Sequence, residues 1–139
     1  MSQENVEIVK ANIDAYNRED WDAFFKDMAP GFELDMTRAV GPVSGVFKLD
    51  QFRPLAVELT EHFESARVEA HELIEAGDIV VVPWTFHVKG RDEIEAAART
   101  TWTFTIREGA IARITLYQER QEALQDLGVL EQDARADSS

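Results

Sequence analysis

The sequence predicts one α+β domain in which two or three N-terminal helices close a curved antiparallel sheet around an apolar pocket. Up to about residue 63, apolar side chains recur mostly with the period of a helix, whereas from about residue 65 they alternate as in strands. Glycines stand at the joints between the strand-like runs. This order implies a helical layer over one face of the sheet. Long strands coil, so a cone-shaped hollow is expected beneath the helices.

Three helices are expected in the first part of the chain. Residues 3–16 place apolar side chains on one helical face, and these are Val6, Val9, Ile13 and Tyr16. Asp20 can cap a second helix, which carries an aromatic stripe and should end at Ala29-Pro30-Gly31. A third helix is expected over residues 50–63, with Pro54 tolerated near its first turn.

The rest of the chain has the pattern of strands. Phe32 to Thr37 alternates apolar and polar residues. Four further strands are expected at residues 66–75, 79–89, 93–107 and 110–120. The turns between them are expected at Gly77-Asp78, Gly90 and Glu108-Gly109, where positive φ is needed. A short helix over 121–127 closes a single domain of residues 1–130, and residues 131–139 form a polar tail expected to be disordered.

Composition excludes several classes of function. The 14 Lys and Arg against 27 Asp and Glu give a formal charge of −13, which repels phosphate backbones and anionic lipids. We therefore expect neither nucleic acid nor a membrane as partner. The chain has no cysteine, which makes a cytoplasmic location the natural expectation. Its first residues are polar and lack the apolar run of a secretory signal.

Neither a cofactor nor a metal is expected. The three histidines, His62, His71 and His87, lie on different elements without metal-binding spacing. No glycine-rich phosphate loop occurs either, so a nucleotide cofactor has no visible cradle.

Five stretches of the chain resemble segments of a known protein family and occur in the same order along the sequence. They are residues 15–23 (AYNREDWDA), 31–38 (GFELDMTR), 74–82 (IEAGDIVVV), 107–111 (REGAI) and Leu116-Tyr117. In these stretches the chain resembles the SnoaL-like polyketide cyclase group of the nuclear-transport-factor-2-like (NTF2-like) superfamily. The resemblance implies a cone-shaped fold, which serves enzymes, binding proteins and assembly domains alike.

The resemblance also allows a comparison with the steroid isomerases of that superfamily. It implies an active site in which a carboxylate acts as the base and faces an oxyanion hole made of a tyrosine and a protonated aspartate. The corresponding tyrosine, base and second-donor positions are Asn12, Met36 and Trp102. Methionine cannot accept a proton, so isomerase chemistry in its known form is expected to be absent. In the similar polyketide cyclases the acid comes from the last strands, where alternation turns no acid inward here.

If the pocket is catalytic, the expected chemistry is acid-base catalysis of cyclase, isomerase or hydrolase-like type without a metal. Asp35 is the candidate base, with Arg38 paired to it at the mouth of the pocket and Asn12 or Trp102 as oxyanion donors. A bulge in the strand would turn Asp35 inward. Strict alternation would instead leave Asp35 on the outer face beside Glu33, paired with a cation. Both arrangements are open at this point.

A convergent set of aromatic and polar side chains indicates a small-molecule site, although the same aromatics could simply fill a core. The candidate ligand-binding residues are Tyr16, Trp21, Phe24, Met36, Phe52, Trp84, Phe86, Trp102 and Gln118. The leading hypothesis is a pocket for a small, apolar, ring-containing molecule. The alternative is a non-catalytic dimeric assembly domain whose cavity is filled by its own side chains.

A homodimer through the outer face of the sheet is expected in either case. Alternation places four apolar side chains on that face, and these are Ile79, Val81, Ile111 and Tyr117. Left in water, they would form an exposed apolar patch, which is typical of an interface.

Overall fold

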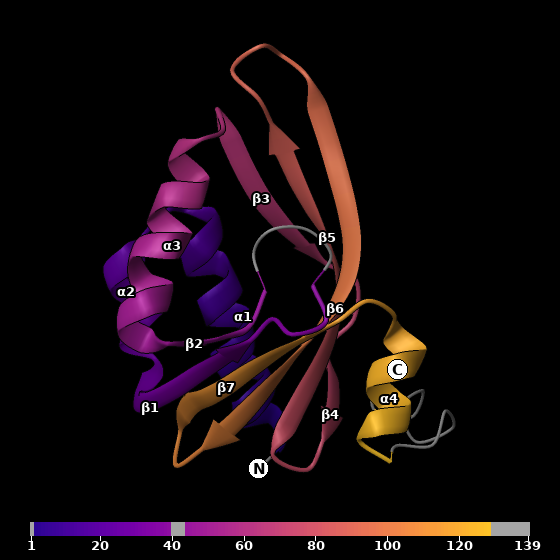
Figure 1. Ribbon diagram of the computed structural model, residues 1–139. Coiled ribbons are helices and arrows are strands. Elements are labelled where there is room, and N and C mark those ends of the chain that lie inside the picture. The colour runs from indigo at the N-terminus through magenta and orange to yellow at the C-terminus, as the bar shows by residue number, and fades with distance from the viewer. Residues whose placement is uncertain (1, 40–43, 129–139) are drawn as a thin grey trace.

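The computed structural model describes residues 2–39 and 44–128 of the chain (Figure 1). Its helices are α1 (Ser2–Asn17), α2 (Trp21–Lys26), α3 (Leu49–Glu61) and α4 (Arg120–Asp126). Its strands are β1 (Met28–Asp35), β2 (Val46–Lys48), β3 (Ser65–Ala70), β4 (Ile74–Ala76), β5 (Ile79–Lys89), β6 (Glu95–Arg107) and β7 (Ala110–Tyr117). None of the helices in these two ranges has the length and apolar character needed to cross a membrane.

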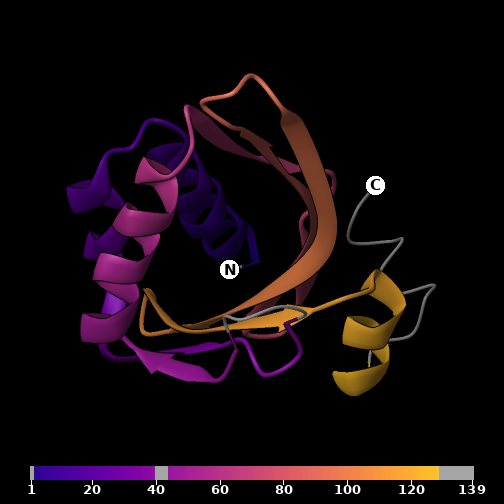
Figure 2. The same cartoon turned by 45° about the horizontal axis from the view of Figure 1, so that its top comes forward.

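The strands form one strongly curved sheet with the order β2-β1-β7-β6-β5-β3, and β4 pairs with the end of β5. Helices α1, α2 and α3 cover its concave side, while α4 lies against the convex side (Figure 2). The expected fold class, a curved sheet closed by N-terminal helices, is confirmed. One pairing differs from the expected antiparallel pattern, because β1 runs parallel to β7. The long chain between these two strands supplies the crossover that a parallel pair requires.

The second helix is shorter than its pattern indicates. Asp20 caps α2 as expected, accepting a hydrogen bond of 3.2 Å from the backbone N–H of Ala23. The helix nevertheless ends at Lys26, and Met28 already pairs with Ile111 of β7. The prediction that Ala29-Pro30-Gly31 ends the helix is therefore wrong. Pairing with β7 extends β1 back through this segment, where a register irregularity accommodates the proline.

The expected strands are found with different ends. The strand expected at 66–75 is two strands, β3 and β4, and the chain between them bonds to β5 through His71 N–H and Pro83 O at 2.9 Å. Gly77 and Gly109 have the expected positive φ, 63° and 77°. At the β5–β6 turn the positive φ of 74° belongs to Glu93, so that role of Gly90 is wrong. The polar tail from residue 131 lies outside the described residues.

The apolar outer face on which the expected dimer rested is covered by the chain itself. Val81 and Tyr117 are buried against Ala123 and Leu124 of α4. Ile111 belongs to the inner core, because the β6–β7 register shifts beside Thr105 and turns Ile111 inward. The described surface therefore lacks the exposed patch that motivated the dimer, and dimerisation stays a prediction.

Candidate functional site

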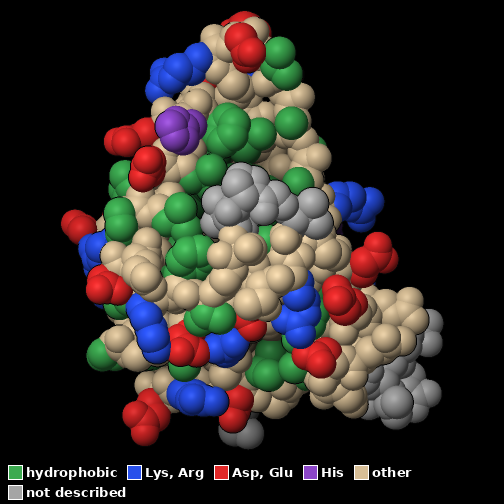
Figure 3. All heavy atoms as spheres, in the orientation of Figure 1, with side chains coloured by type: hydrophobic (Ala, Val, Ile, Leu, Met, Phe, Trp, Pro, Cys, Tyr) green, Lys and Arg blue, Asp and Glu red, His purple; other side chains and the backbone are tan. Residues whose placement is uncertain are grey.

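An apolar cavity of about 550 Å³ lies between the N-terminal helices and the concave face of the sheet. Its wall comes from α1, α2 and α3 on one side and from β1, β3, β5, β6 and β7 on the other. Three of the lining residues, Leu59, Ala98 and Arg99, are exposed, so the cavity reaches the surface. Hydrophobic side chains gather on that face between α3 and the β5–β6 hairpin (Figure 3).

Most of the candidate residues from the sequence converge on this cavity. Those that line it are Asn12, Tyr16, Phe24, Met36, Phe52, Trp84, Phe86, Trp102 and Gln118. Trp21 does not line it but packs edge-on against Tyr16 at 5.6 Å and against Phe24 at 5.9 Å between ring centroids. The placement of Trp21 at the cavity is therefore wrong, because its indole stands outside these two lining rings. Binding of a ligand by the other side chains stays a prediction.

Two polar side chains of the lining are held by backbone carbonyls. Asn12 is 1% exposed, and its Nδ2 donates to Phe24 O at 2.7 Å, which ties α1 to α2. Gln118 Nε2 donates to Arg38 O, also at 2.7 Å. These hydrogen bonds fix the orientation of each amide group.

A third polar group, which sequence reasoning missed, lies among the tryptophans. Thr100 stands directly opposite Trp84 in the β5–β6 register and two residues before Trp102, so all three share the inner face. Its Oγ1 accepts a hydrogen bond of 3.0 Å from the Trp84 indole and one of 3.2 Å from the Trp102 indole. The Trp102 N–H is consequently occupied and is not a free oxyanion donor. Alternation around Trp102 was the signal that could have revealed Thr100.

Asp35, the candidate base, lies on the outer face of the sheet and does not line the cavity. Its strand neighbour Leu34 lies opposite Ile114, and both of those residues line the cavity, so Asp35 points to the other side. The Asp35 carboxylate accepts hydrogen bonds from Thr37 N at 3.0 Å, from Thr37 Oγ1 at 2.6 Å and from Arg113 Nη2 at 2.8 Å. The arrangement without a bulge at Asp35 is therefore the one found.

These contacts also make Asp35 a poor base. Burial alone would raise its pKa, but the hydrogen bonds from Thr37 and the Arg113 guanidinium outweigh burial and lower the pKa below its ordinary value. A carboxylate with a lowered pKa binds protons weakly. Both its position and its electrostatics thus point to a structural role.

Asp35→Asn is expected to lower the free energy of unfolding at pH 7 by about 1–3 kcal/mol. The folded-state pKa is depressed, so the stabilisation is present above the ordinary carboxyl pKa and disappears as the pH falls through the folded value. Urea denaturation of both proteins from pH 7 to pH 3 measures the converging difference. An unchanged free energy of unfolding at pH 7 would contradict the structural role.

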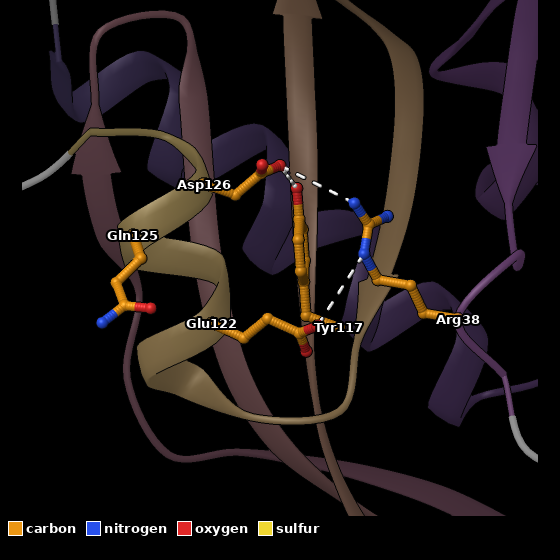
Figure 4. A pocket seen from close by; sticks show the side chains of 5 residues that line it. All are labelled: Arg38, Tyr117, Glu122, Gln125 and Asp126. Carbon is orange, nitrogen blue, oxygen red and sulfur yellow. Dashed lines mark hydrogen bonds and ion pairs between the residues drawn. The ribbon is translucent and has the colours of Figure 1, made fainter.

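Arg38 also lies outside the cavity, in a second and more polar pocket of about 320 Å³ beside α4 (Figure 4). Its guanidinium stands 4.4 Å from the centre of the Tyr117 ring and lies 3.8 Å from Asp126 and 4.0 Å from Glu122. The Tyr117 hydroxyl donates to Asp126. The expected pairing of Arg38 with Asp35 is found at 4.0 Å, but its expected place at the mouth of the cavity is wrong, because the other contacts hold it against α4.

This cluster should be visible in the ionisation of Tyr117. Burial, followed by the hydrogen bond to Asp126 and the charge of that carboxylate, raises the pKa of Tyr117 to about 12. Tyr16→Phe leaves Tyr117 as the sole tyrosine, because the chain has two. We expect its ultraviolet absorbance titration to be centred near pH 12 in the folded protein.

The same shift predicts how stability depends on pH. A raised folded-state pKa means that the contribution is full below the ordinary tyrosine value near 10 and is lost as the pH rises towards 12. Tyr117→Phe should therefore lose less stability between pH 9 and pH 11 than the wild type does, as measured by urea denaturation. A titration of Tyr117 centred near 10 would contradict both expectations.

The cavity itself carries few ionisable groups. Among the described residues that line it, none is an aspartate, glutamate or histidine, and the ionisable ones are Tyr16 and Arg99. Burial raises the pKa of Tyr16, and a long hydrogen bond of 3.4 Å with Thr60 only partly offsets this rise. A neutral tyrosine in an apolar wall can hydrogen-bond to a ligand but does not serve as a base near neutral pH.

A curved sheet closed by helices around an apolar cavity is the NTF2-like fold, and solved structures of similar fold bear this out. TerC co-crystallized with polyporic acid is 21% identical with a TM-score of 0.73, over 89% of this chain and 97% of TerC. RV0760c from Mycobacterium tuberculosis, in complex with estradiol-17beta-hemisuccinate, is 12% identical with a TM-score of 0.73, over 85% of this chain and 95% of its own. A protein of ketosteroid isomerase-like fold from Catenulispora acidiphila, in complex with trimethylamine, is 16% identical with a TM-score of 0.70, over 89% and 94%.

Within that class, the chain belongs to the SnoaL-like domain family, whose sequence model matches residues 9–114. The matched segment runs from the middle of α1 into β7 and so spans most of the cavity wall. No curated protein sequence matches the chain significantly.

Proposed function

We propose that this protein binds a small, flat, ring-containing apolar molecule in the cavity between its helices and its sheet. The observation that carries the proposal is the cavity itself. Its volume of about 550 Å³ falls within the range of small-molecule sites, roughly 300–1,000 Å³. The wall is mainly aromatic and aliphatic, with a few fixed polar groups, which is the usual character of such sites.

The size of the cavity favours this function over the alternative of a non-catalytic dimeric assembly domain. That alternative requires side chains to fill the space, whereas the aromatic rings here pack against one another around it. Two proteins of similar fold were crystallised with small organic molecules, TerC with polyporic acid and RV0760c with estradiol-17beta-hemisuccinate. Those ligands support a small organic molecule as the occupant here.

Binding, rather than proton transfer, is the activity that the lining supports. Met36 lines the cavity at the position that the isomerase resemblance gives to the base, and a thioether cannot accept the proton. Asp35 faces the other side of the sheet. Purified protein is accordingly expected not to isomerise a β,γ-unsaturated ketosteroid above the uncatalysed rate, as followed by absorbance of the conjugated product.

The proposal is tested by tryptophan emission. Two of the three tryptophans, Trp84 and Trp102, line the cavity, and Trp21 does not. A flat ring compound entering the cavity must contact an indole or displace water from it, so we expect a saturable quench or blue shift with at least one member of a panel of steroid-like and aromatic polyketide compounds. Trp102→Leu should remove most of this response.

Trp21→Phe is the matched control and should retain the response. Circular dichroism of both variants establishes that the fold is kept. Emission that stays unchanged with the whole panel would remove the support for a ligand-binding cavity and would favour the assembly domain.

A homodimer through the sheet face and a cytoplasmic location are the further parts of the hypothesis. Light scattering at micromolar concentration measures the first. A lone species of 15.8 kDa would contradict the dimer and would agree with α4 covering the apolar face.

A further inference from the structure

The hydroxyl proton of Thr100 has no hydrogen-bond acceptor among the described residues. A threonine hydroxyl can accept two hydrogen bonds and donate one. Both accepting positions are occupied, since the Trp84 and Trp102 indoles donate to Thr100 Oγ1 at 3.0 Å and 3.2 Å. Among the hydrogen bonds between described residues, Thr100 makes only these two, and it donates in neither.

Thr100 is part of the cavity wall. It lines the cavity together with both indoles, whose ring centroids lie 4.7 Å apart. With two lone pairs engaged by the indoles and Cβ on the fourth corner, the tetrahedral oxygen has one direction left for its O–H bond. A donor in an apolar wall without an acceptor is costly, which favours an acceptor supplied by the occupant of the cavity.

We propose that Thr100 is the group that orients the ligand, donating its hydroxyl proton to a carbonyl oxygen on a flat ring system. This inference rests on the proposed binding function and adds the chemical class of the ligand. Each indole has one N–H group, and both groups donate to Thr100. The indoles can therefore contact the ligand through their ring faces but cannot donate a hydrogen bond to it. The ring of the ligand stacks on the indoles while its carbonyl oxygen meets the hydroxyl between them.

A matched pair of ligands tests this without knowledge of the natural one. Fluorenone and fluorene have the same flat three-ring skeleton and differ in that only fluorenone carries a carbonyl oxygen. Isothermal titration calorimetry with the full-length protein should show that fluorenone binds more tightly. Thr100→Val should weaken fluorenone about five- to tenfold, the effect of one hydrogen bond, and change fluorene less than twofold. Thr100→Ser keeps the hydroxyl and should keep the preference.

Thr100→Val also removes the hydrogen-bond acceptor of both indoles, so it can disturb the cavity wall itself. A measurement on the wild-type protein is therefore needed to detect the hydrogen bond to the ligand directly. The infrared carbonyl stretch of bound fluorenone should lie at lower wavenumber than in a hydrocarbon solvent, as a hydrogen bond requires. The Thr100→Ser protein should reproduce this shift. This measurement remains informative if Thr100→Val does not fold.

The outcomes separate the two proposals. Equal affinities for fluorenone and fluorene with an unshifted carbonyl band would overturn the role of Thr100 and leave the binding function standing. Equal weakening of both ligands by Thr100→Val would assign Thr100 a purely structural role. If neither ligand nor any compound of the wider panel binds, the binding function fails, and the inference about Thr100 fails with it.

Discussion

Replacing Ala56 by phenylalanine is expected to abolish ligand binding, with affinity falling on the order of 100-fold or more. Ala56 is 5% exposed on the inner side of α3 and lines the cavity. A benzyl group at this position would occupy space that the ligand needs, and the ligand would lose burial against the aromatic wall. Because the new ring fills empty volume, the free energy of unfolding should change by no more than about 1 kcal/mol.

Ala97→Phe is the matched control. Ala97 is exposed on β6 and pairs with His87, on the face opposite to the one that Ala98 and Thr100 present to the cavity. The Ala97→Phe protein carries the same new side chain outside the cavity and should bind the ligand as tightly as the wild type does. Binding that survives in the Ala56→Phe protein, measured by calorimetry with the best ligand of the panel, would show that the site lies elsewhere on the molecule.

The parts of this site that could be predicted from the sequence are those governed by alternation along one strand. In β5, alternation turns Trp84 and Phe86 to the same side, and both line the cavity. The alternation also predicts the bounds of this strand, Ile79–Lys89, which are those found. The period of a strand is a local property, so the chain needs no information about its neighbours to reveal it.

The parts that could not be predicted depend on contacts between distant segments. The parallel pairing of β1 with β7 decides where α2 ends. Helix α4 covers Val81 and Tyr117, and no local sequence pattern predicts that the chain turns back onto this face of the sheet. Asp35 illustrates the same limit, because alternation allowed the outward position but a bulge would have reversed it. Its closer cationic partner, Arg113, is 78 residues away in sequence, and no motif links the two.

Thr100 shows a further limit, which lies in side-chain geometry. Alternation could have placed it on the inner face, but not the convergence of two indole N–H groups on a single oxygen. That convergence depends on the rotamers of Trp84 and Trp102 and on their tilted packing at 48°. The residue that we propose as the orienting donor is consequently recognisable only in three dimensions.

Phe32→Ala is expected to cost about 3–5 kcal/mol of the free energy of unfolding, which is a large part of the 5–15 kcal/mol typical of a domain. Phe32 is 0% exposed in β1, and its ring stacks on Phe52 of α3 at 5.6 Å with 21° between the planes. The contact joins a helix of the cavity wall to the sheet. Alanine would leave an unfilled hole there, since the surrounding rings cannot collapse fully.

Urea denaturation measures this loss, and Ile94→Ala is the control. Ile94 is a large apolar side chain of which 67% is exposed, so its truncation should change the free energy of unfolding by no more than about 0.5 kcal/mol. Phe32 does not line the cavity, so ligand affinity of the fraction that stays folded should be retained. A cost below about 1 kcal/mol would contradict the packing of α3 on β1. It would then also weaken the case for a rigid, preformed cavity, because α3 supplies Phe52 and Ala56 to its wall.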